Sequence, residues 1–488
     1  MKTLQALAAY LNISYEHPID LELAHLSIDS RAIQPGDVFC AYQGAVSDGH
    51  DYIQMAIDQG AVLILAERAV VCTVPILVAP DLQARLSALA DWFYDSPSKH
   101  LKVIGVTGTN GKTSTTHYLA QFLHLLGLKV AITGTVGNGI WGALSESTHS
   151  TPSAISLQRQ LAEFVAQSVE YVIIEVSSHA LEQQRVADIH FISAVFTNLT
   201  QDHLDFHKTM EAYAASKAQL FAWPNLKTVI LNKDDPQHLT MVTGVALHTK
   251  IYYYSIAERD DSLTYADDLT LDAQGLGFHL HSFAGEALVK TQLLGSFNVS
   301  NLLAAFTTLL SLNFSLSALA KLSILVHPVK GRMEVLRYPN LPLTVIDYAH
   351  TPDGLEKALS TLKAYAKPVW VVFGCGGNRD AIKRPIMASI AENLADQVII
   401  TEDNSRKESP EIIFADIFKG FKKSEAIRLI PKRAEAITYA LTHAPKDAII
   451  LLAGKGHETY LETQGQKLHF DERDVVKKLA HVLQAQKP

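Results

Sequence analysis

The segment 103–113, VIGVTGTNGKT, constrains this chain more than any other, because an apolar run meets a glycine-rich loop that ends in Gly-Lys-Thr. The apolar run predicts a buried strand, and the apolar spacing that follows predicts a helix. A strand, a glycine loop and a helix start together form a phosphate cradle, since loop N–H groups and the helix dipole face the anion. The segment therefore predicts ATP binding.

The residue types of the loop suit this chemistry. Lys112 supplies a mobile positive charge, and the Thr113 hydroxyl can reach a Mg²⁺ ion that accompanies the phosphates. The strict phosphate-loop pattern expects glycine at position 106, where this chain has Val106. The predicted ATP-binding residues of the loop are Gly108, Thr109, Asn110, Gly111, Lys112, Thr113 and Ser114.

Composition narrows the class of protein. A chain of 488 residues with 48% hydrophobic and 19% charged residues fits a soluble globular protein of several domains. The net charge of −8 disfavours a general nucleic-acid binder. The three cysteines fit no zinc or disulfide framework, which suits a reducing cytoplasm. No signal-peptide pattern or membrane-length apolar stretch is found, so we expect a cytoplasmic protein without membrane insertion.

The alternation of strand and helix patterns predicts three α/β domains, at 1–98, 99–328 and 329–488. The central domain is expected to be a parallel sheet around the phosphate loop, with a small antiparallel addition within 255–300. The last domain is expected to be Rossmann-like. The predicted strands are 62–65, 75–78, 103–106, 130–133, 171–174, 194–198, 228–231, 343–346, 369–373, 398–401 and 448–452.

Polar residues collect at the carboxyl ends of these strands. Glu175 ends a buried run, and a carboxylate near a phosphate loop is where an NTPase holds its metal. His203 and His207 lie one helical turn apart, but no cysteine or third histidine at ligand spacing supports a zinc site. The glycine loop 374–380 lacks the G-x-G-x-x-G pattern that NAD(P) binding requires.

Five segments together resemble the Mur ligase family, the ATP-dependent amide-bond-forming enzymes of bacterial peptidoglycan synthesis. They are 107–113, 175–179, 202–205, 295–301 and 347–350. The family also lacks the glycine that Val106 replaces. Further matches at 29–31, 35–37, 48–49 and 454–458 resemble the member that adds the third residue of the stem peptide. The resemblance covers essentially the whole chain in order.

This resemblance implies an ADP-forming acid–amino-acid ligase that makes UDP-MurNAc-tripeptide. ATP would phosphorylate the D-glutamate γ-carboxylate of UDP-N-acetylmuramoyl-L-alanyl-D-glutamate, and an amine would then attack the acyl phosphate. The three domains would bind the UDP substrate, ATP and the amino acid, in that order. Such an enzyme serves cell-wall biogenesis, and through it cell shape and cell division.

Matching positions imply a second Mg²⁺ site. Glu175 and His203 would bind the ion, and Lys217 would be carbamoylated to an N6-carboxylysine that completes the site. From the residues alone, Lys217 is a solvated helix lysine, the usual case. Carbamoylation would turn this cation into an anionic oxygen ligand, which Mg²⁺ prefers. The implied catalytic residues are Lys112, Glu175, His203 and Lys217, and the implied metal ligands are Thr113, Glu175, His203 and Lys217.

The resemblance also implies the residues that bind the two nucleotide substrates. The further ATP contacts would be Asn298, Asn301, Arg332 and Asp347, although both asparagines could merely cap a helix. The UDP-substrate contacts would be Ile28, Ser30, Ala45, Val46, Ser47, Ser150, Thr151, Ser177, Gln183 and Arg185. Relatives carry His-Gln-Ala where this chain has 45–47, so we expect backbone contacts there.

The segment 403–406, Asp-Asn-Ser-Arg, bears on the incoming amino acid. meso-Diaminopimelate differs from lysine by one extra carboxylate, which Arg406 can bind with a two-pronged, charge-assisted fork. Lysine-adding relatives lack this arginine, so we predict diaminopimelate. Ser405 replaces a proline of the family, which leaves the loop freer. The implied diaminopimelate contacts are Arg379, Asp403, Asn404, Ser405, Arg406, Gly454 and Glu458.

Other functions remain open at this point. One is another carboxylate–amine ligase, such as the lysine-adding member or a folylpolyglutamate synthetase. Another is a non-enzymatic nucleotide switch built on the phosphate loop. The predicted partners are ATP, the UDP substrate, diaminopimelate and Mg²⁺, and we expect a monomer.

Overall fold

The structure, a computed structural model, describes residues 2–14, 20–44, 47–147, 150–272, 274–422 and 427–485. It divides into two compact units. The first unit is Met1–Glu258 with Ala304–Asn313, and the second is Arg259–Leu303 with Phe314–Pro488. The first unit includes one parallel sheet and one mostly parallel sheet. The second unit includes another mostly parallel sheet and an antiparallel three-stranded meander.

The amino-terminal sheet of the first unit is parallel. Its four strands lie in the order β3 (Leu26–Ser27), β4 (Val38–Ala41), β5 (Leu63–Ala66) and β6 (Ile76–Val78). On β4, Val38 faces a core with α1 (Leu4–Leu11) and α3 (Leu82–Phe93), whereas Phe39 faces a core with α2 (Ile53–Asp58). Both faces are covered, which is why β4 and β5 are continuous apolar runs. A short pair, β1 (Lys2–Thr3) and β2 (Glu22–Leu23), is antiparallel.

The central sheet surrounds β7 (Lys102–Thr107). Its first-unit strands lie in the order β13 (Lys250–Ser255), β12 (Thr228–Asn232), β11 (Phe191–Phe196), β7, β10 (Tyr171–Glu175), β8 (Val130–Thr133) and β9 (Asn138–Ile140). All are parallel except β9. Between β10 and β11 the chain crosses from one side of β7 to the other. Ligands of open α/β sheets bind at such a switch point, outside the carboxyl ends of the strands.

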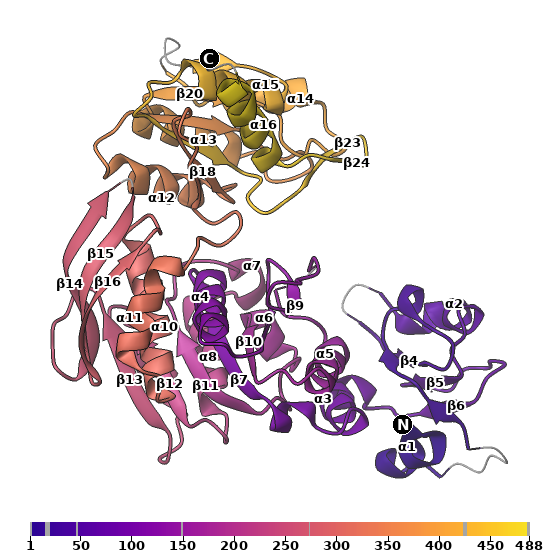
Figure 1. The fold of residues 1–488 in the computed structure, drawn as a ribbon. Coiled ribbons are helices and arrows are strands. Elements are labelled where there is room, and N and C mark those ends of the chain that lie inside the picture. The colour runs from indigo at the N-terminus through magenta and orange to yellow at the C-terminus, as the bar shows by residue number, and fades with distance from the viewer. Residues whose placement is uncertain are drawn as a thin grey trace. The chain divides into compact units, whose positions relative to one another are not determined.

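Helices cover both faces of this sheet. Helix α4 (Lys112–Leu125) lies against β7, β8 and β10, and its Phe122 meets Phe306 of α10 (Phe297–Ser311). The other face packs on α5 (Ala154–Ala166) and α8 (Met210–Ala218) (Figure 1). Three short helices follow strands of this sheet, namely α6 (Ser178–Glu182), α7 (Leu204–His207) and α9 (His238–Met241).

The second unit opens with an antiparallel meander. It comprises β14 (Leu263–Asp272), β15 (Gly275–Ser282) and β16 (Gly285–Thr291), and α11 (Leu316–Leu322) packs against β16 (Figure 1). This confirms the antiparallel addition that the sequence predicts within 255–300.

The carboxyl-terminal sheet is Rossmann-like. Its strands lie in the order β17 (Glu334–Leu336), β18 (Leu343–Asp347), β22 (Ile449–Ala453), β19 (Val369–Phe373), β20 (Gln397–Ile400) and β21 (Ile427–Leu429). Only β17 of these six runs antiparallel. A hairpin of β23 (Tyr460–Thr463) and β24 (Gln466–His469) follows.

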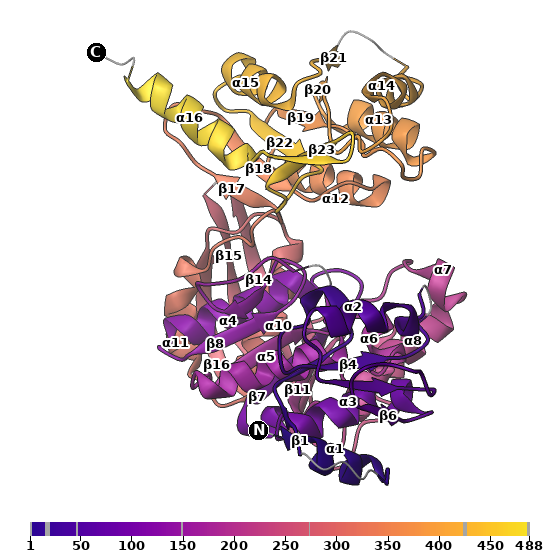
Figure 2. The same cartoon turned by 90° about the vertical axis from the view of Figure 1, so that its right-hand side faces the viewer.

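Alternation along these strands divides the core into two layers. Val371 packs with α12 (Pro352–Lys363), α13 (Lys383–Leu394) and α14 (Pro410–Phe418). Its neighbour Val372 packs with α15 (Arg433–His443) and α16 (Glu472–Ala485) on the opposite face (Figure 2). The doubly wound arrangement confirms the predicted fold class.

Two expectations about the whole chain can be compared with the structure. Among the described residues, no helix is both long enough and apolar enough to cross a membrane. All three cysteines, Cys40, Cys72 and Cys375, are free thiols. The domain boundaries at 98 and 328 remain predictions.

Candidate active site

The phosphate loop connects β7 to α4 and is held in one shape by the loop after β11. Gly108 has φ of +148°, and a Cβ there would lie 1.9 Å from Thr197 Oγ1, so only glycine fits. The backbone N–H of Thr109 donates to the Asn198 carbonyl at 2.8 Å. The backbone N–H of Asn110 donates to the Asn198 side-chain oxygen at 2.9 Å. Asn198, which the sequence motifs do not single out, therefore fixes the loop.

Lys112 begins α4 and folds back over this loop. Its ammonium donates to the carbonyl oxygens of Gly108 at 2.7 Å and Thr109 at 2.8 Å. The side chain is half-buried, so the charge lies beside the loop N–H groups at the helix start. Ser114, in the first turn, is buried. This arrangement suits a polyphosphate anion.

Glu175 is the last residue of β10 and is fully buried behind the loop. Its carboxylate accepts hydrogen bonds from the Thr113 hydroxyl at 3.0 Å and from the backbone N–H and hydroxyl of Thr135 at 3.0 and 3.1 Å. Burial raises the pKa of the Glu175 carboxyl, and the positive charge of Lys112 acts in the opposite direction. A buried carboxylate among hydroxyls is an oxygen donor set that fits Mg²⁺.

Lys217 lies in the last turn of α8 and is only 1% exposed. Its amine donates to the Gly108 carbonyl at 2.9 Å and lies 4.6 Å from the centre of the Tyr213 ring. Burial holds the pKa of this amine well below its usual value, and the nearby Lys112 charge lowers that pKa further. The interpretation of Lys217 as a solvated helix lysine is therefore wrong.

His203 precedes α7 with φ of +52°, and its side chain is exposed. The ring lies 4.9 Å from the His179 ring and 6.1 Å from the Tyr213 ring. Its Nε2 lies 3.5 Å from a carboxylate oxygen of Asp202. Tyr213, whose hydroxyl is 3.2 Å from Thr109 Oγ1, thus contacts the phosphate loop, Lys217 and His203. Tyr213 is a site residue that the sequence patterns miss.

The structure gives no support to a zinc site formed by His203 and His207. His207 is buried, and its Nε2 lies 2.8 Å from the Ser178 hydroxyl. Among the side chains that the structure describes, His203 and His207 belong to no cluster of three metal-ligating groups.

Four of the predicted UDP-substrate residues form one network beside Glu175. Thr151 Oγ1 donates to the Glu175 backbone carbonyl at 2.7 Å and lies 3.2 Å from Ser177 Oγ. The Arg185 guanidinium donates to the Thr151 carbonyl and to the Gln183 side chain, both at 2.9 Å. Arg185 is half-buried, and burial lowers its pKa. A cation is therefore fixed next to the strand end that holds Glu175.

Most of the remaining UDP-substrate residues belong to the amino-terminal part of the chain, whereas Ser150 directly precedes Thr151. Ile28 and Ser30 follow β3, and the Ser30 hydroxyl contacts the Met55 sulfur at 3.3 Å. Ser47 is exposed and Ser150 is half-buried. Ala45 and Val46 lie outside the described residues.

In the second unit, Asp347 ends β18 and accepts a hydrogen bond from the Met333 backbone N–H at 2.7 Å. Burial raises the pKa of Asp347 to about 6, although the Arg332 charge opposes this rise. The Arg332 guanidinium lies 5.2 Å from the centre of the Tyr348 ring, and its Nε has no hydrogen-bond partner among the described residues. A buried, unpartnered N–H beside a carboxylate is suited to a polar ligand.

The two asparagines of α10 do not act as N-caps. Asn298 lies inside the helix and donates to the Leu294 carbonyl at 2.8 Å. Asn301 donates to the Asn298 side-chain oxygen at 3.2 Å. Both are buried, and their proposed nucleotide contacts remain predictions.

Arg406 lies after β20 with φ of +54° and is 25% exposed. Its Nη1 donates to the Gly377 carbonyl at 2.9 Å, and its Nε lies 3.7 Å from a Glu462 carboxylate oxygen. A Cβ on Gly377 would lie 2.0 Å from the Ser405 carbonyl. The glycine loop 374–380 thus allows the chain to pass close to 403–406, which accounts for its glycines. Arg379 of that loop is exposed.

Lys455 holds together the residues around Asn404 and Glu458 in the second unit, although no sequence motif assigns it a role. It is fully buried and donates to Asn404 Oδ1 at 2.9 Å and to Glu458 Oε2 at 2.7 Å. Its ammonium also lies 3.7 Å from an Asp403 carboxylate oxygen. Gly454, with φ of +113°, precedes it. A lysine between two glycines after a buried strand is the sequence signal that could have revealed it.

The fold and these two sites define a class: a phosphate-loop enzyme with a Rossmann-like domain after it. Three family models match the chain. They are described as Mur ligase family, catalytic domain (residues 22–91), Mur ligase middle domain (106–309) and Mur ligase, glutamate ligase domain (331–456). Together with the full-length relatives below, these matches show that the chain belongs to the Mur ligase family and is a ligase.

Individual relatives resemble nearly the whole chain. A Pseudomonas aeruginosa protein named UDP-N-acetylmuramoyl-L-alanyl-D-glutamate--2,6-diaminopimelate ligase is 44% identical over 460 residues, covering 93% of this chain and 94% of that protein. A solved structure of a ligase of the same name shares 34% identity with a TM-score of 0.72 over 99% of both chains. A MurF ligase from Thermotoga maritima, solved in complex with ADP, shares the fold at 19% identity and a TM-score of 0.65, covering 96% of this chain and 100% of that one.

Proposed function

We propose that this chain is the ATP-dependent ligase that joins meso-diaminopimelate to the D-glutamate γ-carboxylate of UDP-N-acetylmuramoyl-L-alanyl-D-glutamate. The observation that carries the proposal is the convergence of Lys112, Glu175 and Lys217 on one phosphate loop. The names and full-length similarity of the relatives support the substrates. The enzyme would act in the cytoplasm, where ATP is available. The expected monomeric state remains a prediction.

ATP binding rests on the loop and on Lys112. The Lys112 ammonium is at present satisfied by two loop carbonyls, and it would exchange these for phosphate oxygens when ATP binds. Thr113 and Glu175 would hold Mg²⁺, which neutralises phosphate charge when bound. Lys112 and the bound Mg²⁺ would supply positive charge where a substrate carboxylate must approach a triphosphate, two groups that otherwise repel each other.

Lys217 would contribute as a carbamate. Burial lowers the pKa of its amine and so favours the uncharged, nucleophilic form. Attack of that amine on carbon dioxide would form a nitrogen–carbon bond and release one proton. The product would offer anionic oxygens close to Gly108, where the amine now donates a hydrogen bond. With His203 and Glu175, these oxygens would form the second Mg²⁺ site.

Two substitution steps complete the reaction. An oxygen of the D-glutamate γ-carboxylate attacks the γ-phosphorus of ATP, and ADP leaves with the electrons of the broken P–O bond. The amine of diaminopimelate then attacks the acyl carbon, phosphate leaves, and the amine nitrogen loses a proton. Positioning and electrostatic stabilisation are the main contributions of the protein to both steps.

Arg406 would select the amino acid. The described contacts of its guanidinium involve Nη1 and Nε, so further donors can form a fork with the second carboxylate of diaminopimelate. Lysine lacks that carboxylate and would leave the arginine without its anionic partner. Lys455 would hold Glu458 in place, and the second oxygen of Glu458 could accept the substrate ammonium.

Phosphate release measures this function directly. The enzyme is incubated with ATP and Mg²⁺, with and without the UDP-dipeptide substrate, and with diaminopimelate or lysine at equal concentrations. We expect release only when the UDP substrate and diaminopimelate are both present. Equal release with lysine would support the lysine-adding alternative instead. Release with ATP alone would contradict the ligase proposal.

A further inference from the structure

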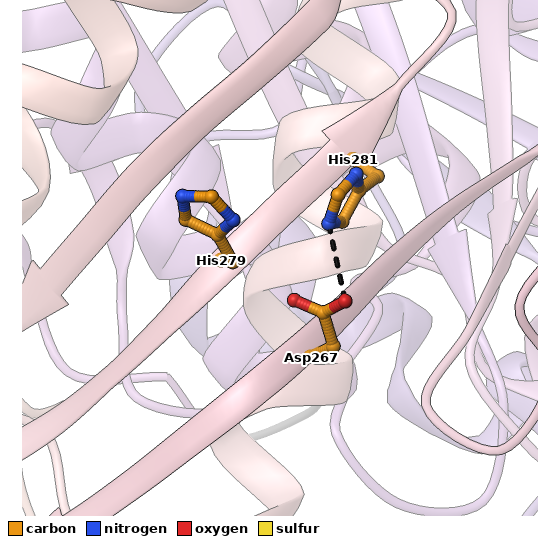
Figure 3. Close-up of side chains that lie close together, drawn as sticks. All are labelled: Asp267, His279 and His281. Carbon is orange, nitrogen blue, oxygen red and sulfur yellow. Dashed lines mark ion pairs between the residues drawn. The ribbon is translucent and has the colours of Figure 1, made fainter.

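A cluster of metal-ligating side chains lies on the antiparallel meander of the second unit. Asp267 of β14 and His279 and His281 of β15 each offer a ligand atom, and these atoms lie within 4.8 Å of one another. Figure 3 shows the three side chains converging between the two strands. No other three His, Cys, Asp or Glu side chains in the described part of the chain converge in this way.

Strand register explains the convergence. Asp267 is directly opposite His279, and His281 is opposite Glu286 of β16. Because residues two apart on a strand share a face, both histidines point to the same side of the sheet. The register shifts between Asp267 and Thr270, where Asp268 has φ of +50°. A β-bulge at such a point re-aims the neighbouring side chains.

The spacing of the ligand atoms also matches that of two ligands on one metal ion. His281 Nε2 lies 3.2 Å from Asp267 Oδ2. Two ligands of a tetrahedral Zn²⁺ ion are about 3.3 Å apart, given metal–ligand distances near 2.0 Å. Yet His281 Nε2 has no hydrogen-bond partner among the described residues, and neither has Asp267 Oδ1, although both atoms are buried. Buried polar atoms of this kind need a partner.

The environment of His281 also orients the ring for a metal. Its Nδ1 lies 3.1 Å from Glu286 Oε1. The tautomer with its proton on Nδ1 would donate to Glu286 and turn the Nε2 lone pair toward Asp267. The Tyr265 ring stacks on His281 at 4.6 Å, with 9° between the ring planes. A carboxylate that holds the far nitrogen of a histidine ligand is a recurring support in metal sites.

We propose that Asp267, His279 and His281 bind one divalent transition-metal ion of the zinc class, with Glu286 as a positioning residue for His281. Two imidazoles and one carboxylate favour Zn²⁺, Co²⁺ or Ni²⁺ over Mg²⁺. Three protein ligands leave a fourth position for water. This site is chemically distinct from the oxygen-donor set around Glu175.

Metal content tests the proposal on the full-length, tag-free enzyme dialysed against Zn²⁺ at low concentration. The wild type is expected to retain one more Zn²⁺ per chain than Asp267→Asn or His281→Gln. Glu286→Gln is expected to bind Zn²⁺ about 10- to 100-fold more weakly. His469→Gln is a matched control, because His469 is an exposed histidine paired with a single carboxylate, Asp474, at 3.9 Å. The His469→Gln variant should bind as much Zn²⁺ as the wild type.

A spectroscopic readout separates this site from the proposed Mg²⁺ site. Bound Co²⁺ should give the visible absorption of a low-coordinate ion in the wild type and in His203→Gln, but not in His279→Gln. Circular dichroism verifies that each variant is folded. Equal Zn²⁺ content in the wild type and both ligand variants, or an unchanged Co²⁺ spectrum in His279→Gln, would overturn the proposal and leave the cluster as an ion network.

Discussion

A lysine amine that is 1% exposed cannot behave like a surface lysine. Removing an ammonium from water is costly, so burial favours the neutral form of Lys217, and the Lys112 charge favours it further. A neutral amine is a nucleophile, whereas an ammonium ion is not. The burial of this one residue therefore supports the proposal that Lys217 is carbamoylated.

Lys217→Ala should lower turnover by about 10²-fold or more, since an anionic oxygen ligand of the proposed second Mg²⁺ site is removed. Short carboxylic acids should restore part of the activity by occupying the vacated position. Steady-state turnover with and without added acetate measures both effects. Lys227→Ala changes an exposed lysine of the same unit and should behave as the wild type. Full activity of Lys217→Ala would refute the carbamate.

Arg406→Ala should raise the KM for diaminopimelate by about 10- to 100-fold, because hydrogen bonds to a charged partner contribute about 1.5–3 kcal/mol. The KM for ATP should stay unchanged. The KM of Arg406→Lys for diaminopimelate should lie between those of the wild type and Arg406→Ala, since lysine keeps the charge but cannot form the two-pronged contact. Arg428→Ala removes another second-unit guanidinium, which lies over Tyr439, and serves as the control. An unchanged diaminopimelate KM would place specificity elsewhere.

The raised pKa of Asp347 makes the stability of the fold depend on pH. Its folded pKa of about 6 exceeds the ordinary value of 3.8, so the folded protein holds this proton more tightly than the unfolded chain. Stability from this group should therefore fall as pH rises from about 4 to 6, and the penalty should persist above pH 6.

Asp347→Asn replaces the titrating carboxyl group with a neutral amide, so the free energy of unfolding should become less pH-dependent. The difference in the free energy of unfolding between the variant and the wild type should grow by at most about 3 kcal/mol from pH 4 to pH 7. Denaturant unfolding followed by the fluorescence of Trp370, which lies in β19 of the same sheet, measures it. A difference that is constant with pH would show that Asp347 titrates normally.

At the scale of elements, the unit formed by β7, the phosphate loop and α4 depends on close backbone approach. Gly108→Ala combines a φ of +148° with a clash against Thr197, so ATP binding should be lost and the protein destabilised by more than about 1 kcal/mol. Gly127→Ala is the matched control, because Gly127 also has positive φ but no atom within 4 Å of an added Cβ. Calorimetric ATP titration and thermal unfolding distinguish the two. Wild-type ATP affinity in Gly108→Ala would contradict the loop assignment.

At the scale of the whole molecule, the proposed chemistry uses residues of both compact units. Lys112 and Glu175 belong to the first unit, and Arg406 and Asp347 to the second. One acyl phosphate must meet both the ATP site and the amine, so substrate binding is expected to draw the units together. X-ray scattering should show a smaller radius of gyration with all substrates bound. Lys112→Ala with the same ligands is the control, and identical profiles for the wild type would contradict closure.

Much of the fold could be predicted because apolar periodicity and residue spacing along the sequence indicate its strands and helices. Alternation of buried apolar runs with amphipathic segments indicated the strands. Among these strands, the largest difference between predicted and observed bounds is at 194–198, where the observed strand β11 is Phe191–Phe196. The glycine loop, Glu175 and Arg406 were recognisable because each is tied to a strand end or a fixed spacing. These features depend on neighbours in sequence.

Only the tertiary structure decided which groups are buried together. Lys217 contacts Gly108 and Tyr213, and the charge of Lys112 lowers its pKa. Gly108 and Lys112 lie about a hundred residues away in sequence. The Lys455 network and the Asp267–His279–His281 cluster arise in the same way, from register and strand order. The sequence by itself determined the phosphate loop and the layered α/β fold. Desolvation and charge proximity, which are set by long-range packing, determined what the side chains around that loop can do.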